Sequence, residues 1–419
     1  MPRSGWFRRQ QTLLATGEAS AAKPLKKRGL ALTASSAVLV LGAGVAIVAF
    51  AAPGSHASPV APVSFANRAA TSNQAATSRP AAALQLAAVT PEAGAKGVNG
   101  ASPIRVQFSS PLAASSPMPT LSPKIAGSWK VQGEEAVFTP VVGYFENTKV
   151  TVTIPSGMMS AAGASAGSGG TLSSAVKKSF STGSFSTLRL QQLLAQLGYL
   201  PMTWKAASGP AVSAGNARAE LSAAYSAPAG TFSWQGSYPW NLTHQWKAGS
   251  ANLLQVGAVR AFESVRGLTM DGTAGHPVWS DLLTAVAKGQ KDPNGYTYAL
   301  ASQVLPETLK VWHNGRLVLD SPANTGISAA ATADGTFPVY LRYYFTYMKG
   351  TNPDGTKYDD PVYYVSYFNG GDAVHYFDRY SYGFNQSLGC VEVPWDSAKT
   401  AWPYLTYGSL VTVTGPVGA

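Results

Sequence analysis

Cysteine is almost absent from this chain, which has a single one, Cys390, in 419 residues. One cysteine excludes an intramolecular disulfide, so its thiol is either a small core side chain or a reactive group. The five histidines are not spaced with other ligands as a metal site requires, and no phosphate-cradling glycine loop follows a strand. We therefore expect no metal and no cofactor.

Charged residues are also scarce, at 12% of the chain, while 42 glycines and 28 prolines favour strands and turns over long charged helices. A hydrophobic content of 45% excludes global disorder. The net charge of +11 is concentrated in residues 1–28, which hold seven Lys and Arg against one Glu. The remainder lacks the basic, aromatic-studded stripe of a nucleic-acid binder. We predict no nucleic-acid partner.

An uncharged, apolar segment at residues 29–52 follows this basic head and is long enough to cross a bilayer, with the positive charge inside. It is either a signal peptide cleaved near Ser55-His56-Ala57 or a retained membrane anchor, and its length slightly favours the anchor. In both cases we expect the rest of the protein to lie outside the cytoplasm. Residues 53–85, rich in Ala, Ser and Pro, are predicted to form an extended linker.

Residues 86–185 contain short runs that alternate between apolar and polar side chains, separated by Pro and Gly clusters. Clear examples are Ile104–Phe108, Val137–Val141 and Val150–Ile154. This pattern predicts an antiparallel β-sandwich. The segment resembles the bacterial Ig-like modules of cell-surface proteins, and its lack of a histidine indicates a spacer.

Helical periodicity begins near Thr187, where four leucines at 190, 193, 194 and 197 share one face. Thr187 is the predicted N-cap and Gly198 the predicted end of this helix. Residues 186–290 resemble the helical peptidoglycan-binding module, interrupted by an insertion at about 201–255. The resemblance implies affinity for glycan strands, but an ordinary helical scaffold explains the pattern equally well.

Residues 296–415 return to strand patterns. An Asn-Gly pair at 314–315 predicts a hairpin between 309–312 and 316–319, and residues 409–414 predict a closing strand. The polar, glycine-containing stretch at 342–361 is predicted to be a mobile loop over a cleft. The chain as a whole is thus expected to be a multidomain, mainly β protein with one small helical domain.

The chemistry is expected at Cys390, because His375 precedes it by 15 residues, enough for a strand, a loop and a return beside that strand. A thiol nucleophile needs a nearby base, and His375 is the natural partner. A buried structural cysteine is the alternative.

The surrounding motifs resemble those of the L,D-transpeptidases, the YkuD-type family. They are G-D-A-V-H at 371–375, S-Y-G-F at 381–384, S-L-G-C-V-E-V-P at 387–394, T-G at 325–326 and G-T-F at 335–337. The resemblance covers about the last 120 residues. It implies that Cys390 attacks a peptidoglycan stem tetrapeptide at its third residue, a diamino acid, and expels D-Ala. The amine of a second stem then resolves the thioester as a 3→3 crosslink.

The resemblance also implies the roles of the site residues. His375 is the general base and then acid, oriented by the backbone carbonyl of Tyr376. Gly389 and the Cys390 N–H are where an oxyanion hole forms. Candidates for substrate binding are Ser387, Arg379, Asp372 and Tyr367, with Arg342 as a further cation. The expected partners are therefore stem peptides, glycan strands through 186–290, and a membrane through 29–52 if that segment is retained.

Two residues depart from the family pattern. Leu388 stands where a histidine is common, and Glu392 stands where Arg or Asn is common. A carboxylate at 392 that faced inward would oppose thiolate formation, so we expect Glu392 to point away from the site. Three alternatives to crosslinking remain open: an L,D-carboxypeptidase, another cysteine acyltransferase, and a non-catalytic wall-binding relative.

Overall fold

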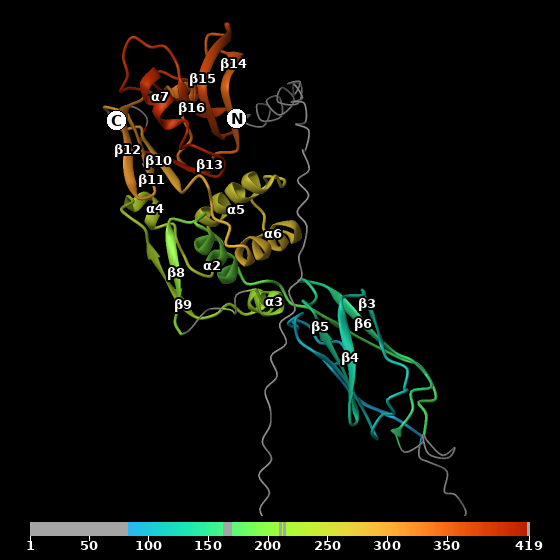
Figure 1. The fold of residues 1–419 in the computed structure, drawn as a ribbon. Helices are drawn as coiled ribbons and strands as arrows, with labels where there is room; N and C mark the ends of the chain where they lie inside the picture. Colours follow the sequence, from blue (N-terminus) through green and yellow to red (C-terminus); the bar gives the residue numbers. More distant parts are fainter. Residues whose placement is uncertain (1–82, 162–169, 209–211, 213–214, 417–419) are drawn as a thin grey trace, which may run out of the picture. The chain divides into compact units, whose positions relative to one another are not determined.

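The computed structural model describes residues 83–161, 170–208, 212 and 215–416 (Figure 1). The predicted basic head, the apolar segment at 29–52 and nearly all of the linker at 53–85 lie outside these ranges. Within the described ranges, no helix combines the length and apolar character needed to cross a membrane.

The first domain is a sandwich of two antiparallel sheets, and its core is built from the alternation seen in the sequence. Ile104, Val106 and Phe108 are buried while the residues between them are exposed. One sheet has the order β1 (Leu86–Thr90), β2 (Ile104–Phe108), β5 (Glu135–Pro140), β4 (Gly127–Gln132). The other has the order β3 (Thr120–Ser122), β6 (Lys149–Ile154), β7 (Val176–Ser181).

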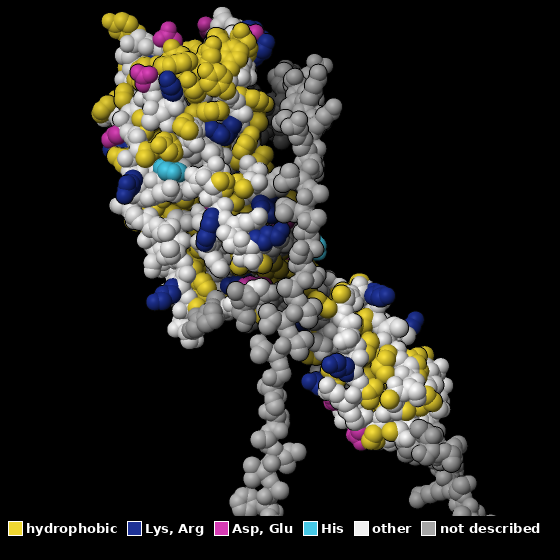
Figure 2. Space-filling view, viewed as in Figure 1, with side chains coloured by type: hydrophobic (Ala, Val, Ile, Leu, Met, Phe, Trp, Pro, Cys, Tyr) yellow, Lys and Arg dark blue, Asp and Glu magenta, His cyan; other side chains and the backbone are white. Residues whose placement is uncertain are grey.

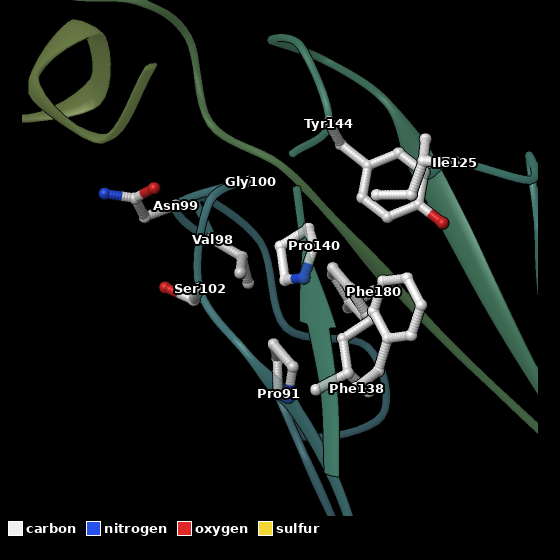
Figure 3. A pocket seen from close by; sticks show the side chains of 11 residues that line it. Pro91, Val98, Asn99, Gly100, Ser102, Ile125, Phe138, Pro140, Tyr144 and Phe180 are labelled. Atoms are coloured by element: carbon white, nitrogen blue, oxygen red, sulfur yellow. The ribbon is translucent and has the colours of Figure 1, made fainter. Parts of the chain in front are cut away.

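A pocket at one end of this sandwich is lined mainly by apolar side chains, among them Pro91, Val98, Phe138 and Phe180 (Figure 3). Its lining includes no Asp, Glu, Lys, Arg or His. The hydroxyl of Tyr144, also in the lining, donates to the Pro123 carbonyl at 2.7 Å. The pocket lining therefore offers no carboxylate, amine, guanidinium or imidazole group.

The helical region is centred on α2 (Thr187–Leu197), α5 (Leu253–Arg266) and α6 (His276–Ala287). The predicted N-cap is wrong by one residue, because the Ser186 hydroxyl accepts the Arg189 N–H and Thr187 is already helical. Gly198 ends α2 in the left-handed conformation, with φ 88°, as the sequence predicted.

The insertion at 201–255 is structured rather than an extended loop. It contains the paired strands β8 (Met202–Ala206) and β9 (Gly230–Trp234), and the helices α3 (Ala217–Tyr225) and α4 (Trp240–Thr243). The buried cluster around α2, α5 and α6 continues into Tyr298 and Leu410 of the next domain. The helical region and the C-terminal domain thus share a core.

The C-terminal domain has two sheets. The first has the order β12 (Arg316–Pro322), β11 (Thr308–His313), β10 (Thr297–Ser302), β18 (Leu410–Thr414), β13 (Gly335–Pro338). The predicted turn between β11 and β12 is present, because Asn314 and Gly315 both have positive φ, at 48° and 74°.

The second sheet has the order β14 (Leu341–Thr351), β15 (Lys357–Asn369), β16 (Asp372–Tyr376), β17 (Val391–Val393). The predicted mobile loop at 342–361 is therefore wrong: β14 and β15 form one long antiparallel hairpin with a short turn between Thr351 and Lys357. Its many tyrosines suit a pleated, half-exposed strand. Figure 2 shows hydrophobic side chains gathered over this end of the molecule, and Tyr343, Tyr344, Phe345 and Tyr347 are exposed there.

The two faces of this second sheet have different partners. Val374, Val391 and Val393 face the core shared with the first sheet and with α7 (Trp395–Ala401). Ala373 and Cys390 belong to a separate cluster on the opposite face. Side chains alternate along strands, so the face that carries Cys390 is the one that carries the candidate chemistry.

Candidate active site

Cys390 and His375 are carried by neighbouring parallel strands. In the β16–β17 register, Val374 lies opposite Val391 and His375 opposite Glu392. Cys390 immediately precedes β17, so it is a diagonal neighbour of His375 on the same face. The fold therefore brings together the two residues that sequence reasoning paired across 15 positions.

The thiol is covered by the β14–β15 hairpin. Its sulfur lies 3.9 Å from the Met348 sulfur and 3.8 Å from the Gly371 carbonyl oxygen. Tyr367, a candidate for substrate binding, packs in the same cluster. Sequence reasoning did not predict Met348 as a site residue. Its position in a strand with several exposed aromatic residues could have indicated it. In this conformation the Cys390 thiol lies beneath hydrophobic side chains of the β14–β15 hairpin.

His375 is held in one orientation and is 2% exposed. Its Nδ1 lies 2.9 Å from the carbonyl oxygen of Tyr376. When Nδ1 donates to this carbonyl, Nε2 is the nitrogen that accepts a proton. Burial lowers the pKa of His375 below its ordinary value, so the imidazole rests neutral and can act as a base.

The Cys390 thiol rests in its protonated form. Burial raises the pKa of Cys390 strongly, and the carboxylates of Asp372 and Glu392 raise it further, while the Ala373 N–H acts in the opposite direction. A raised thiol pKa beside a lowered imidazole pKa favours the neutral pair over a thiolate–imidazolium pair.

Glu392 does not point away from the site, contrary to expectation. It lies opposite His375 in the parallel register, on the face that carries Cys390, and is 4% exposed. The side chain of Arg379 neutralises it through two hydrogen bonds of 2.8 Å, from Nε to Oε2 and from Nη2 to Oε1. A bidentate pair of this kind satisfies both oxygens of a buried carboxylate.

This pairing also corrects the prediction that Arg379 is available for a substrate carboxylate. Its Nη2 additionally donates to the Gln386 carbonyl at 3.2 Å, which ties the loop before the cysteine to β17. Arg342 is engaged as well, stacking over Trp402 at 4.4 Å and donating to its carbonyl. Both arginines are structural in this conformation.

The turn before Cys390 is fixed by Ser387 and Gly389. The Ser387 hydroxyl donates to the Cys390 carbonyl at 2.6 Å and accepts the Gly389 N–H at 3.3 Å. Ser387 is fully buried, so it shapes the turn instead of meeting a substrate, which corrects its predicted role. Gly389 has φ 114°, a conformation that favours glycine. With its N–H already bonded, Gly389 does not offer a free oxyanion donor in this conformation.

The T-G motif at 325–326 lies next to the same turn and holds it through hydrogen bonds. Asn324 and Glu392 exchange two backbone hydrogen bonds of 2.9 Å. The Thr325 carbonyl accepts a hydrogen bond from the Ser387 N–H. The Thr325 N–H and hydroxyl donate to the buried carboxylate of Glu307 at 2.5 and 2.8 Å. Sequence reasoning did not single out Glu307, because its motif partner lies 18 residues away.

Asp372 opens β16 beside the cysteine turn. Its Oδ2 accepts the Asn369 side-chain amide at 3.2 Å. A Cβ placed on Gly389 would lie 2.5 Å from Asp372 Oδ1, so the carboxyl packs directly on the Gly389 backbone. Burial raises the pKa of Asp372 to about 7. Within the described residues, no group of three or more His, Cys, Asp or Glu could hold a metal ion.

Two family models match the chain, in two separate regions. Residues 80–182 match the bacterial Ig-like domain, as the sequence predicted. Residues 298–413 match the L,D-transpeptidase catalytic domain, YkuD, and contain both His375 and Cys390. The match assigns residues 298–413 of the chain to the L,D-transpeptidase catalytic domain.

Solved L,D-transpeptidases are similar to this chain. One from Mycobacterium smegmatis is 14% identical, with 79% of this chain and 99% of that one covered and a TM-score of 0.26. L,D-transpeptidase 3 from Mycobacterium tuberculosis is 12% identical, with 79% and 98% covered and a TM-score of 0.26. The catalytic domain of the Enterococcus faecium enzyme is 26% identical over 28% of this chain and 96% of that one, with a TM-score of 0.26. No curated protein matches. The assignment of residues 298–413 rests on the model match.

Proposed function

We propose that this protein is a peptidoglycan L,D-transpeptidase that forms 3→3 crosslinks through a thioester on Cys390. One observation carries the proposal: within the matched catalytic domain, the chain's single cysteine and a buried, neutral histidine share one face of a sheet. A thiol with an adjacent, oriented base is the arrangement needed for nucleophilic acyl transfer.

In the first half-reaction, Cys390 attacks the carbonyl of the third residue of a stem tetrapeptide. His375 takes the thiol proton as the S–C bond forms and returns it to the amine of D-Ala as the C–N bond breaks. The Tyr376 carbonyl supports the imidazolium that forms, through the 2.9 Å contact to Nδ1. The buried Glu392 raises the pKa of His375 and so favours the same cation, while its partner Arg379 lowers that pKa.

In the second half-reaction, the side-chain amine of a second stem attacks the thioester carbonyl and the sulfur leaves. Water competes for the same thioester, which would give L,D-carboxypeptidase activity. The hairpin cover formed by Met348 and Tyr367 has to open for the donor to enter. Its closure over an acyl-enzyme would then keep water out.

The proposed location is outside the cytoplasm, held at the membrane through residues 29–52 or secreted into the cell wall. The Ig-like domain would act as a spacer, and the helical region at 186–290 would approach glycan strands. Both proposals follow from the order of segments along the chain.

A second candidate is a non-catalytic wall-binding relative. It is favoured by the raised pKa of Cys390 and by the presence of Glu392 on the catalytic face. Against it, Arg379 neutralises Glu392, so the departure at position 392 comes with its own compensation.

Incubating the protein with a disaccharide-tetrapeptide and separating the products by mass tests the proposal. Dimers joined between two third residues, with one D-Ala released for each, are expected. Release of D-Ala with tripeptide only would assign a carboxypeptidase. Unchanged tetrapeptide would favour the non-catalytic relative.

A further inference from the structure

We propose that Asp372 is the catalytic residue of the second half-reaction: it binds the ammonium group of the acceptor and takes a proton from it. This inference rests on the proposed function, because it concerns the acceptor of the same thioester. It names Asp372, the first residue of β16, as the side chain that binds the acceptor.

The first argument for this role is the position of Asp372. Its carboxyl oxygen packs on the Gly389 backbone, one residue before the nucleophile. Its negative charge raises the pKa of the Cys390 thiol. The Gly371 carbonyl, adjacent in sequence, lies 3.8 Å from the same sulfur. Asp372 therefore lies against the residue that immediately precedes the nucleophile in the chain.

The second argument is that Asp372 has no cationic partner among the described residues. Glu392, the other carboxylate near the thiol, is occupied by Arg379. Asp372 accepts the Asn369 side-chain amide, and the Ala333 N–H lowers its pKa. Across the described ranges, no Lys, Arg or His forms an ion pair with Asp372. The one cation that the reaction itself supplies is the acceptor's ammonium, and an unpaired carboxylate is suited to receive it.

The proton balance of the step is complete with groups already present. The ammonium gives one proton to the Asp372 carboxylate and becomes a nucleophilic amine. Its nitrogen bonds to the thioester carbonyl carbon, and the C–S bond breaks. The second proton passes through His375 to the departing sulfur, which restores the Cys390 thiol, and Asp372 returns its own proton to water. Burial holds the pKa of Asp372 at about 7, where both protonation states are accessible.

The test is the product ratio of Asp372→Asn, which keeps the shape of the side chain and its packing on Gly389. Crosslinked and hydrolysed products arise from one thioester, so their ratio is independent of how fast the thioester forms. We expect the ratio to fall by about a hundredfold, the lower range for loss of a general base. Asp359→Asn is the matched control, since Asp359 is exposed and paired with Lys349 at 2.8 Å, and its ratio should equal that of the unmodified chain.

Hydroxylamine as acceptor provides the second measurement, because it arrives uncharged at neutral pH. Asp372→Asn should retain its capture of the thioester while losing capture by the diamino acid. An unchanged ratio in Asp372→Asn, or equal loss with both acceptors, would overturn the inference and leave the proposed function standing. If the unmodified chain forms no thioester at all, it is the proposed function that fails.

Discussion

Arg379 binds Glu392 through two hydrogen bonds of 2.8 Å on the same sheet face as Cys390 and His375. A carboxylate two residues after the nucleophile would otherwise leave a negative charge unbalanced beside the thiol. The arginine comes from the loop before the cysteine, so the pair both neutralises the carboxylate and holds that loop against β17. The departure from the family pattern at position 392 is thus part of a two-residue unit.

Breaking this pair should be costly. Arg379→Gln leaves Glu392 nearly buried without its cation, and we expect the free energy of unfolding to fall by about 3 kcal/mol, the lower range for such a broken pair. Chemical denaturation measures it. Glu392→Gln in the same chain should recover much of the loss, because the orphaned charge is removed. Strictly additive single and double variants would contradict the account.

The acid limit of activity should lie below the ordinary titration range of histidine. Burial lowers the pKa of His375, so the imidazole stays a competent base at pH values where a free histidine, with a pKa of about 6.5, is already protonated. A pH profile of D-Ala release measures this limit. His375→Gln should reduce turnover by about a hundredfold or more while the near-UV circular dichroism stays unchanged; full activity in that variant would refute the role of base.

Because of Asp372, the free energy of unfolding should fall as the pH rises. Its folded-state pKa of about 7 lies above the ordinary value for aspartate. The folded chain therefore binds the proton more tightly than the unfolded one, and this stabilisation is fully present below about pH 4 and is lost as the pH passes 7. Comparing denaturation curves of the parent chain and Asp372→Asn isolates the effect. The difference between the two should change with pH across this window, and a constant difference would argue against a raised pKa.

Met348→Ala should expose the thiol. Met348 lies 3.9 Å from the Cys390 sulfur, and its removal opens the hairpin cover. We expect alkylation of Cys390 by iodoacetamide to accelerate roughly fivefold, the effect of about 1 kcal/mol of lost cover. Met348→Leu, similar in volume, serves as the control and should react close to the parent rate. Equal rates for all three chains would show that the hairpin does not limit access.

Gly389→Ala should damage the site more than a similar change nearby. Gly389 has φ 114°, and an added Cβ would lie 2.5 Å from Asp372 Oδ1. Gly370 also has a positive φ, at 54°, but its Cβ would meet nothing within 4 Å. We expect Gly370→Ala to cost about 1 kcal/mol for backbone strain alone, and Gly389→Ala to cost more and to abolish D-Ala release. Equal losses of stability in the two variants would mean that the contact with Asp372 is unimportant.

Local chemistry made much of this fold predictable from the sequence. The alternation at Ile104–Phe108, the Gly198 helix end and the Asn314-Gly315 turn each depend on residues close in sequence, and each is present. Three predictions failed because tertiary contacts decided them. The 342–361 stretch pairs as a hairpin, Glu392 turns toward His375, and Arg379 is occupied by Glu392. An ion pair 13 residues apart cannot be read from spacing alone.

The central claim is that Cys390 becomes acylated, and the intact mass of the protein after exposure to a carbapenem tests it most directly. A strained β-lactam keeps its leaving amine tethered, so attack by the thiol adds the whole inhibitor mass. The account predicts one adduct per chain, located at Cys390 by peptide mapping and absent from Cys390→Ser. An unmodified chain beside a labelled control enzyme, or an adduct on another residue, would contradict it.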